Sequence, residues 1–318
     1  MIMKCLGFIA ILIAAPFWAG ATAHAETLRV GKVVAQNFGF VPLNVGVDKG
    51  LFKSRGLDIN EFDFAGGAKQ QQALVAGNID IAIGGGTDMG FIPKGSPMIA
   101  IAVITSSPKF MGFIAGDDPS LKTMADLKGK LVGVSTAGSL TKWLVDRLNL
   151  SQGWGAEGAT PVAIGGALGT EVAALKTHQV AAFVDAPAIG YRLEGEQAGH
   201  LLFTADAYLK NFEVFVIYAA NSLVAQNPDA IRRFLSGWFD AVQYMRGHKS
   251  ETVEIARKIT GFPKPVEERE YDLLMPEFST SGKFDPAALE SLAQSFVDLK
   301  VLPQKPDMAK LYTEKFLP

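Results

Sequence analysis

Six turns in the sequence carry the residue types that bind small polar molecules, namely glycines, hydroxyls, amides and acids. Each turn directly follows a run of residues that is typical of a strand. In open α/β sheets the strand ends form the ligand crevice. Glycine lets the backbone approach a ligand closely, and the first N–H groups of a following helix are free to bind it. Any single turn could be a plain connection, but six of them favour a shared cleft. The turns are residues Gln36–Phe40, Gly66–Lys69, Gly84–Asp88, Ser106–Ser107, Ser135–Thr141 and Gly165–Thr170.

The motifs of common catalytic and metal sites find little support. The segment Gly133–Gly138 has one residue too many for the G-x-S-x-G nucleophile turn, and Gly84–Gly90 has the wrong spacing for a dinucleotide-binding loop. His178, His200 and His248 lack the paired spacing of zinc ligands. We therefore predict a protein that is not an enzyme, with no catalytic residues, no metal and no cofactor.

The composition is that of a folded protein without a nucleic-acid partner. The chain has 318 residues, of which 48% are hydrophobic and 19% charged, so it is too apolar to be disordered. Its 30 Lys and Arg residues and 32 Asp and Glu residues give a net charge of −2, so no basic field attracts nucleic acid. The length predicts about two domains of ~150 residues each.

The first 25 residues have the pattern of a secretory signal peptide. Lys4 precedes an apolar run from Leu6 to Ala15, and Ala23-His24-Ala25 offers small residues at an A-x-A cleavage site. The run is shorter than the ~20 residues of a membrane-spanning helix. We expect cleavage after Ala25 and a soluble, periplasmic protein; an uncleaved anchor is the alternative. The single cysteine, Cys5, would leave with this peptide, so the exported chain could form no disulfide.

Strands and helices alternate along the rest of the chain. Leu28–Val33 reads as a first strand, Val41–Asp48 as a helix and Leu57–Phe64 as a second strand; the same order starts again at Leu131–Ser135, with a helix over Ser139–Leu150. This alternation predicts an α/β architecture with mainly parallel sheets flanked by helices. In the last third, Asn227-Pro228 begins a predicted helix whose apolar residues from Ile231 to Met245 fall at helical spacing, which we interpret as core.

The two halves of the chain share a local pattern. Gly66-Gly67-Ala68 and Gly165-Gly166-Ala167 each follow a strand, begin a helix with an Ala-Leu seam and lead into another strand. We interpret this as two lobes of similar plan, although so short a match could arise by chance.

Several strings resemble those of periplasmic substrate-binding proteins of ABC importers, in the group that binds nitrate, sulfonates or taurine and includes pyrimidine-binding relatives. The strings are Leu28–Gly31, Asp48–Phe52 followed by Gly56-Leu57, Ala76–Ala82, and Asp126–Val134 with Gly138-Ser139 after it. The resemblance covers almost everything after the leader. It implies the two-lobed periplasmic-binding-protein fold of type II, with a hinge and a ligand cleft between the lobes.

The resemblance also implies roles for particular residues. Ser139 matches a serine that commonly faces the ligand, but the histidine usual a few residues later is absent and Lys142 lies nearby. Gly67 and Ala68 match a turn whose amides face the ligand. Thr87 and Asp88 lie in a turn that lines the cleft of relatives, and Asp185 holds a similar place in the second lobe.

Acids at strand ends bear on the ligand. Asp88, Asp185 and Glu213 follow predicted strands, and the turns hold few cations beyond Lys69 and Lys142. A bare anion such as nitrate would meet unfavourable carboxylates. We therefore expect a ligand with an amine or ring N–H, or an amphoteric one such as an aminosulfonate. The alternative, that these acids cap helices, has equal weight.

We predict the solute-binding component of an ABC import system, a monomer that delivers a small solute to an inner-membrane permease. Residues 26–107 would form the first part of lobe 1, residues 108–212 lobe 2, and residues 213–318 the hinge crossover and C-terminal helices returning to lobe 1. An enzyme on the same fold and a periplasmic ligand sensor are the alternatives. The predicted ligand-binding residues are Gln36, Asn37, Phe38, Gly67, Ala68, Thr87, Asp88, Ser106, Ser139, Gly166, Asp185 and Glu213.

Overall fold

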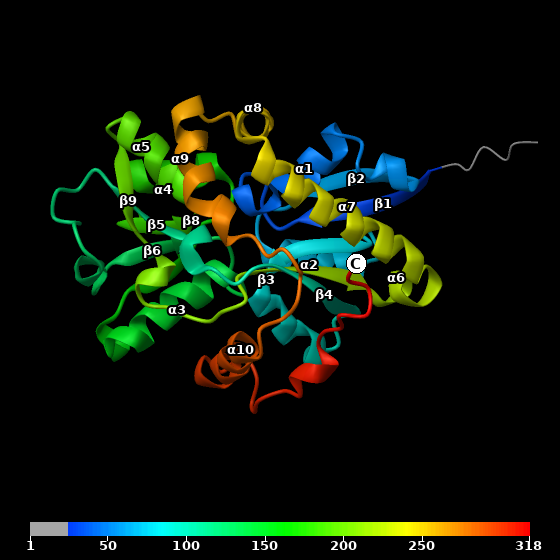
Figure 1. Ribbon diagram of the computed structural model, residues 1–318. Coiled ribbons are helices and arrows are strands. Elements are labelled where there is room, and N and C mark those ends of the chain that lie inside the picture. Colours follow the sequence, from blue (N-terminus) through cyan, green and yellow to red (C-terminus); the bar gives the residue numbers. More distant parts are fainter. Residues whose placement is uncertain (1–24) are drawn as a thin grey trace, which may run out of the picture.

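The computed structural model describes residues 25–318, so the predicted leader lies outside the described residues except for Ala25. This part of the chain contains two five-stranded sheets, each at the centre of one lobe (Figure 1). The first sheet consists, in spatial order, of β2 (Leu57–Asp63), β1 (Glu26–Lys32), β3 (Ile81–Gly85), β10 (Phe215–Ala220) and β4 (Met98–Thr105). The second consists of β7 (Thr160–Ala163), β6 (Leu131–Val134), β8 (Ala182–Asp185), β5 (Gly112–Gly116) and β9 (Gly199–Thr204).

The two sheets repeat one topology. β1 is parallel to β2 and β3, and β6 is parallel to β7 and β8. β10 and β5 run antiparallel to both of their neighbours. The predicted α/β fold with two lobes is confirmed, and its sheets are mixed. The antiparallel strands arise because the chain crosses between lobes twice, from β4 to β5 through residues 106–111 and from β9 to β10 through residues 205–214. We call these the two crossing segments.

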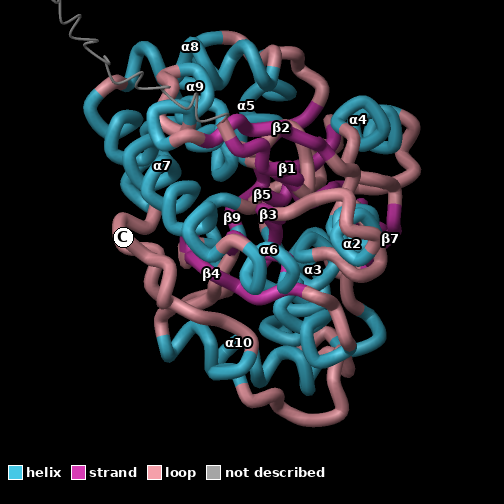
Figure 2. The backbone as a smooth tube through the Cα atoms, turned by 90° about the vertical axis from the view of Figure 1, so that its right-hand side faces the viewer, coloured by secondary structure: helices cyan, strands magenta, loops and turns pink. Residues whose placement is uncertain are grey.

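Helices cover both sheets, and a view turned by 90° shows α7 on one side of the molecule with α2 and α4 on the other (Figure 2). The helices next to the first sheet in the chain are α1 (Val41–Asp48), α2 (Gly67–Val75), α6 (Asn221–Gln226) and α7 (Pro228–Gly247). Those within the second lobe are α3 (Leu140–Gln152), α4 (Leu168–Lys176) and α5 (Pro187–Gly195). The chain ends with α8 (Lys249–Thr260), α9 (Lys264–Leu274) and α10 (Pro286–Asp298).

The amphipathic pattern of α7 produces the expected helix. The side chain of Asn227 accepts a hydrogen bond from the Ala230 N–H and so caps the first turn. Ile231, Phe234 and Trp238 are fully buried on one face. The helix therefore contributes its apolar stripe to the core, as predicted.

The C-terminal helices contact both lobes. Arg269 of α9 pairs with Glu194 of α5 at 2.7 Å, and the indole N–H of Trp143 in α3 donates to Ser295 of α10 at 3.1 Å. Phe262 and Val266, near the start of α9, pack in the core of the second lobe. The lobe boundaries given above stay predictions.

None of the helices within residues 25–318 is both long enough and apolar enough to cross a membrane.

Candidate ligand-binding cleft

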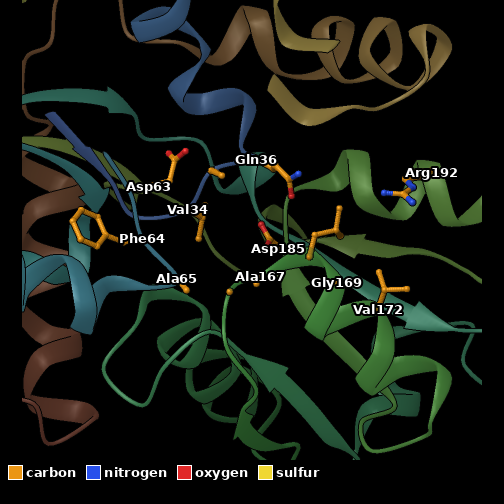
Figure 3. A pocket seen from close by; sticks show the side chains of 13 residues that line it. Val34, Gln36, Asp63, Phe64, Ala65, Ala167, Gly169, Val172, Asp185 and Arg192 are labelled. Atoms are coloured by element: carbon orange, nitrogen blue, oxygen red, sulfur yellow. The ribbon is translucent and has the colours of Figure 1, made fainter. Parts of the chain in front are cut away.

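An open cleft of about 590 Å³ lies between the two lobes (Figure 3). The first lobe contributes residues that directly follow β1 and β2, and the second contributes the turn before α4, part of α4, the end of β8 and one side chain of α5. The lining residues are Val34, Ala35, Gln36, Asp63, Phe64, Ala65, Gly166, Ala167, Leu168, Gly169, Val172, Asp185 and Arg192.

A smaller cavity of about 30 Å³ adjoins the cleft, and we call it the inner chamber. Val34 and Asp185 line both spaces, so the chamber continues the cleft inward. Its other polar lining comes from Asn37 and Asp88 of the first lobe and from Ser135, Ser139 and Thr141 of the second. The remaining lining residues are Val33, Gly67, Gly85, Met111, Leu140 and Phe215.

Strand ends place the polar groups around the chamber. Asp88 follows β3, Ser135 follows β6, and Asp185 is the last residue of β8. These strands are parallel to their neighbours β1, β7 and β6, so their carboxyl ends meet at one edge of each sheet. The two edges face each other across the cleft, which is the usual position of a ligand site in α/β sheets.

Two glycines allow the lobes to touch beside the chamber. A β-carbon on Gly66 would lie 2.7 Å from Thr136 Cγ2, and one on Gly166 would lie 3.2 Å from Val34 Cγ1. Gly66 also has a φ of +112°, which L-residues rarely adopt. Both Gly-Gly turns that the sequence comparison paired therefore lie where the lobes approach each other.

Ser139 joins a hydroxyl network at the start of α3. Its Oγ donates to Thr136 O at 2.7 Å, lies 2.8 Å from Thr141 Oγ1 and accepts from the Lys142 N–H at 3.3 Å. The Ser135 N–H in turn donates to Thr141 Oγ1 at 2.9 Å. The network holds three hydroxyl groups at the chamber wall. Lys142 itself pairs with Asp146 at 2.5 Å and does not line the chamber.

Asp88 is a buried acid whose bonding is incomplete. Its side chain is 1% exposed, and Oδ2 has no hydrogen-bond partner. Burial raises the pKa of Asp88 to about 7, although a hydrogen bond from the Gly85 backbone opposes the shift. A β-carbon on Gly84 would lie 2.6 Å from Asp88 Oδ2 and 2.9 Å from Gln70 Oε1, which also lacks a partner. Two buried oxygens without partners therefore lie near the same point.

Asp185 and Glu171 of α4 form a second acidic site. Burial raises the pKa of Asp185, while the Ala186 N–H, which donates to Asp185 Oδ1 at 2.7 Å, opposes the shift. Burial and the neighbouring charge of Asp185 both disfavour the ionised form of Glu171, so the pKa of Glu171 is raised well above its usual value. Both carboxyl groups therefore take up protons more readily than free carboxyl groups do. Glu270 of α9 is also buried, and burial raises its pKa as well.

Two predicted amides lie at the first lobe's side of the cleft. Asn37 Oδ1 accepts from the Gly39 N–H at 2.9 Å, which leaves the Asn37 amide nitrogen buried without a partner. Gln36 Nε2 donates to Thr260 O at 3.4 Å and lines the outer cleft.

The structure places five of the predicted binding residues outside the lining of both spaces. Ser106 donates to Glu213 at 2.5 Å, and the second carboxyl oxygen of Glu213 accepts from the Asp285 N–H at 2.8 Å. This makes Glu213 a buried anchor for the segment before α10, close to the capping role that the sequence left open.

Phe38 packs in an aromatic cluster with Tyr271 and Phe278, at centroid distances of 6.1 and 6.0 Å. Thr87 lines a separate cavity beside α10, and Ala68 is a half-buried residue in the first turn of α2. Their predicted ligand contacts depended on chain position alone, which does not give the direction of a side chain.

Some lining residues escaped prediction. Ser135 and Thr141 lie in a turn that was singled out, and their hydroxyl content was the available signal. Glu171 gave no signal, because an acid in the first turn of a helix is usually an exposed favourable charge. Within the described residues, no group of three or more His, Cys, Asp or Glu side chains is placed to hold a metal ion.

The sequence of the chain matches a known protein family. The family model described as "NMT1/THI5 like" matches residues 37–252, which is more than half of the chain. The chain belongs to the NMT1/THI5-like family. A Brucella abortus protein, named as a candidate binding protein, is 28% identical to this chain over 264 residues. The match covers 80% of this chain and 79% of the Brucella protein.

Two solved structures of the same fold carry the names of solute-binding proteins. The alkanesulfonate-binding protein SsuA from Xanthomonas axonopodis pv. citri, bound to MOPS, has a TM-score of 0.76 at 18% identity, covering 91% of this chain and 98% of that one. The periplasmic nitrate-binding protein NrtA from Synechocystis PCC 6803 has a TM-score of 0.71 at 17% identity, covering 92% and 87%. The predicted family and the periplasmic-binding-protein fold of this NMT1/THI5-like chain are confirmed.

Proposed function

We propose that this NMT1/THI5-like protein is the solute-binding component of an ABC import system. It captures a small polar organic solute, either sulfonate- or taurine-like or bearing an amine or ring N–H, and delivers it to a permease in the inner membrane. The observation that carries the proposal is the polar inner chamber, which lies between the facing edges of two sheets. The adjoining cleft of about 590 Å³ is in the size range of small-molecule sites.

Capture follows from the way the lobes are joined. Within residues 25–318, only the two crossing segments and the C-terminal helices connect the lobes, while the cleft is lined from both sides. A solute that contacts both walls binds the closed arrangement better than the open one, so it shifts the population toward closure. The permease can then distinguish the closed, solute-bound protein from the open, empty one.

The location and the partners belong to the same proposal. The leader of residues 1–25 would be removed after Ala25 on export, and the mature protein would work as a periplasmic monomer. The small solute and the ABC permease are its partners, and catalysis is not needed for this role.

A solute screen on the protein purified after export tests the proposal. Thermal unfolding would be followed with sulfonates, taurine, nitrate, aromatic acids, pyrimidines and amines. A solute at ~100 times its Kd should add about 2.7 kcal/mol to the free energy of unfolding, which is a visible rise in Tm. A solute that stabilises the protein and is recovered unchanged supports binding without catalysis. Conversion of the solute would support the enzyme alternative.

Uptake separates transport from sensing. Deletion of the gene should abolish accumulation of the radiolabelled solute found in the screen, and the wild-type gene should restore it. Normal uptake in the deletion strain would contradict the import role and favour a ligand sensor.

A further inference from the structure

The charge of the inner chamber is one-sided. Among the described residues that line it are two carboxyl groups, those of Asp88 and Asp185, and no Lys, Arg or His. In the outer cleft, Arg192 already pairs with Glu196 at 2.7 Å. An anionic group in the chamber would therefore face carboxyl oxygens without a compensating cation.

Helix N-termini could offset this, but the protein's own groups already occupy them. A β-carbon on Gly67, the first residue of α2, would lie 3.3 Å from Asp88 Oδ1, so this carboxyl group lies beside the start of that helix. Asp185 Oδ1 accepts from Ala186 at the start of α5, and Ser139 caps α3. At these three helix starts beside the chamber, a group of the protein thus already lies where an external anion would gain from the helix dipole. The start of α4, which lines the outer cleft, has no side-chain cap.

The chamber also limits the size of the group that enters it. A volume of about 30 Å³ holds one or two groups of the size of a water molecule. A protonated primary amine is of this size, whereas a sulfonate carries three oxygens around its sulfur.

Two residues that line the chamber carry buried polar atoms without partners. The Oδ2 atom of Asp88 and the amide nitrogen of Asn37 lack hydrogen bonds, although these side chains are only 1% and 3% exposed. Asp88 offers the chamber an acceptor in either protonation state, because Oδ1 remains an acceptor when Oδ2 carries a proton.

We propose that the inner chamber binds a protonated primary amine of the solute, with Asp185 and Asp88 accepting its N–H groups. The inference rests on the proposed function and names the solute class. The body of the solute then lies in the outer cleft, and an acceptor group next to the amine can meet the free N–H of Asn37 in the chamber wall. An aminosulfonate would accordingly enter with its amine inward and its sulfonate outward.

Fragments of the size of the chamber test this directly, because they do not depend on knowing the body of the solute. The exported protein would be unfolded thermally in about 100 mM methylammonium chloride, with tetramethylammonium chloride, sodium methanesulfonate and sodium nitrate at the same concentration. Methylammonium should raise Tm by about 2–4 °C over tetramethylammonium, which has the same charge but no N–H donor.

Two variants make the test specific. Asp185→Asn should remove the methylammonium effect, and it should fold because it relieves repulsion with Glu171. Asp240→Asn, which removes a carboxyl group that pairs with Arg55 away from the cleft, should leave the effect unchanged. For each variant, the Tm with a fragment is compared with the Tm of the same variant without the fragment.

The possible outcomes separate failure of the amine site from failure of the proposed function. Stabilisation by methanesulfonate or nitrate, without stabilisation by methylammonium, would overturn the amine assignment and still support a binding protein. An equal effect of methylammonium on Asp185→Asn would overturn the assigned site. No effect of any fragment would also overturn the inference, whereas the solute screen and the uptake assay would continue to judge the proposed function.

Discussion

At the scale of single residues, Asp88 shows how a buried acid at a strand end depends on its surroundings. Gln70 Nε2 donates to the backbone oxygens of Gly31 and Ile83, both at 2.9 Å, so the Gln70 carbonyl oxygen is held in place beside Asp88. The hydroxyl of Tyr218 donates its hydrogen bond to Gly85 O at 2.7 Å and not to Asp88. Asp88 thus has no described cation as a partner, and its neutral form fits the site better than its ionised form.

This predicts an unusual pH dependence of folding. Because the pKa of Asp88 rises from 3.8 to about 7 on folding, its contribution to stability is fully present below pH ~4 and is lost as pH rises through about 7. Asp88→Asn cannot ionise, so the variant should be more stable than wild type at pH 8 by about 2–4 kcal/mol. The difference should disappear near pH 4, as measured by denaturant unfolding at a series of pH values.

The exposed acid Asp240 provides the control. Asp240→Asn should follow the wild-type pH profile, because this side chain is about half exposed. Parallel profiles for Asp88→Asn and wild type would show that folding does not raise the pKa of Asp88. A cation paired with Asp88 would then be required to offset the burial of its charge.

At the scale of elements, the two Gly-Gly turns fix how closely the lobes approach. A β-carbon on Gly166 would lie 3.1 Å from Ser135 Cβ and 3.2 Å from Val34 Cγ1, and Val34 belongs to the other lobe. Gly169, one turn later in α4, has nothing within 4 Å of its β-carbon position, although it lines the same cleft. The two glycines form a natural pair of test sites.

Gly166→Ala should therefore weaken solute binding while leaving the fold intact. An added methyl group in a packed contact costs about 1–3 kcal/mol, so the Kd of the solute found in the screen should rise about tenfold, as measured by calorimetric titration. Gly169→Ala should bind normally and gain slightly in stability, because alanine favours a helix over glycine. Equal affinities for the two variants would contradict the role of the Gly166 contact in closure.

The sequence predicts elements better than it predicts directions of side chains. Alternating apolar runs identified β1, β2 and α7, because burial on one face leaves a period in the sequence. The antiparallel strands β10 and β5 were not foreseen, since their direction depends on where the chain crosses between lobes. For the same reason, Asp88 and Asp185 were placed near the cleft by their strands, whereas Phe38 and Glu213 follow similar strands and point into the core.

At the scale of the whole molecule, the account requires the lobes to open and close around the cleft. Val34 of the first lobe and Gly166 of the second lie next to each other between the outer cleft and the chamber. A solute in the chamber would have to pass between them. Locking these two positions together should therefore trap a bound solute or exclude a free one.

The most direct test is a reversible lock in the double variant Val34→Cys/Gly166→Cys. The β-carbon position of Gly166 is close enough to Val34 for a disulfide, and Cys5 is the only natural cysteine, lying within the predicted leader. The measurement is the release rate of radiolabelled solute from protein oxidised after loading. We predict release at least about 100-fold slower than after reduction, and no uptake by protein oxidised before loading. Equal release from the oxidised and reduced forms would contradict capture between the lobes.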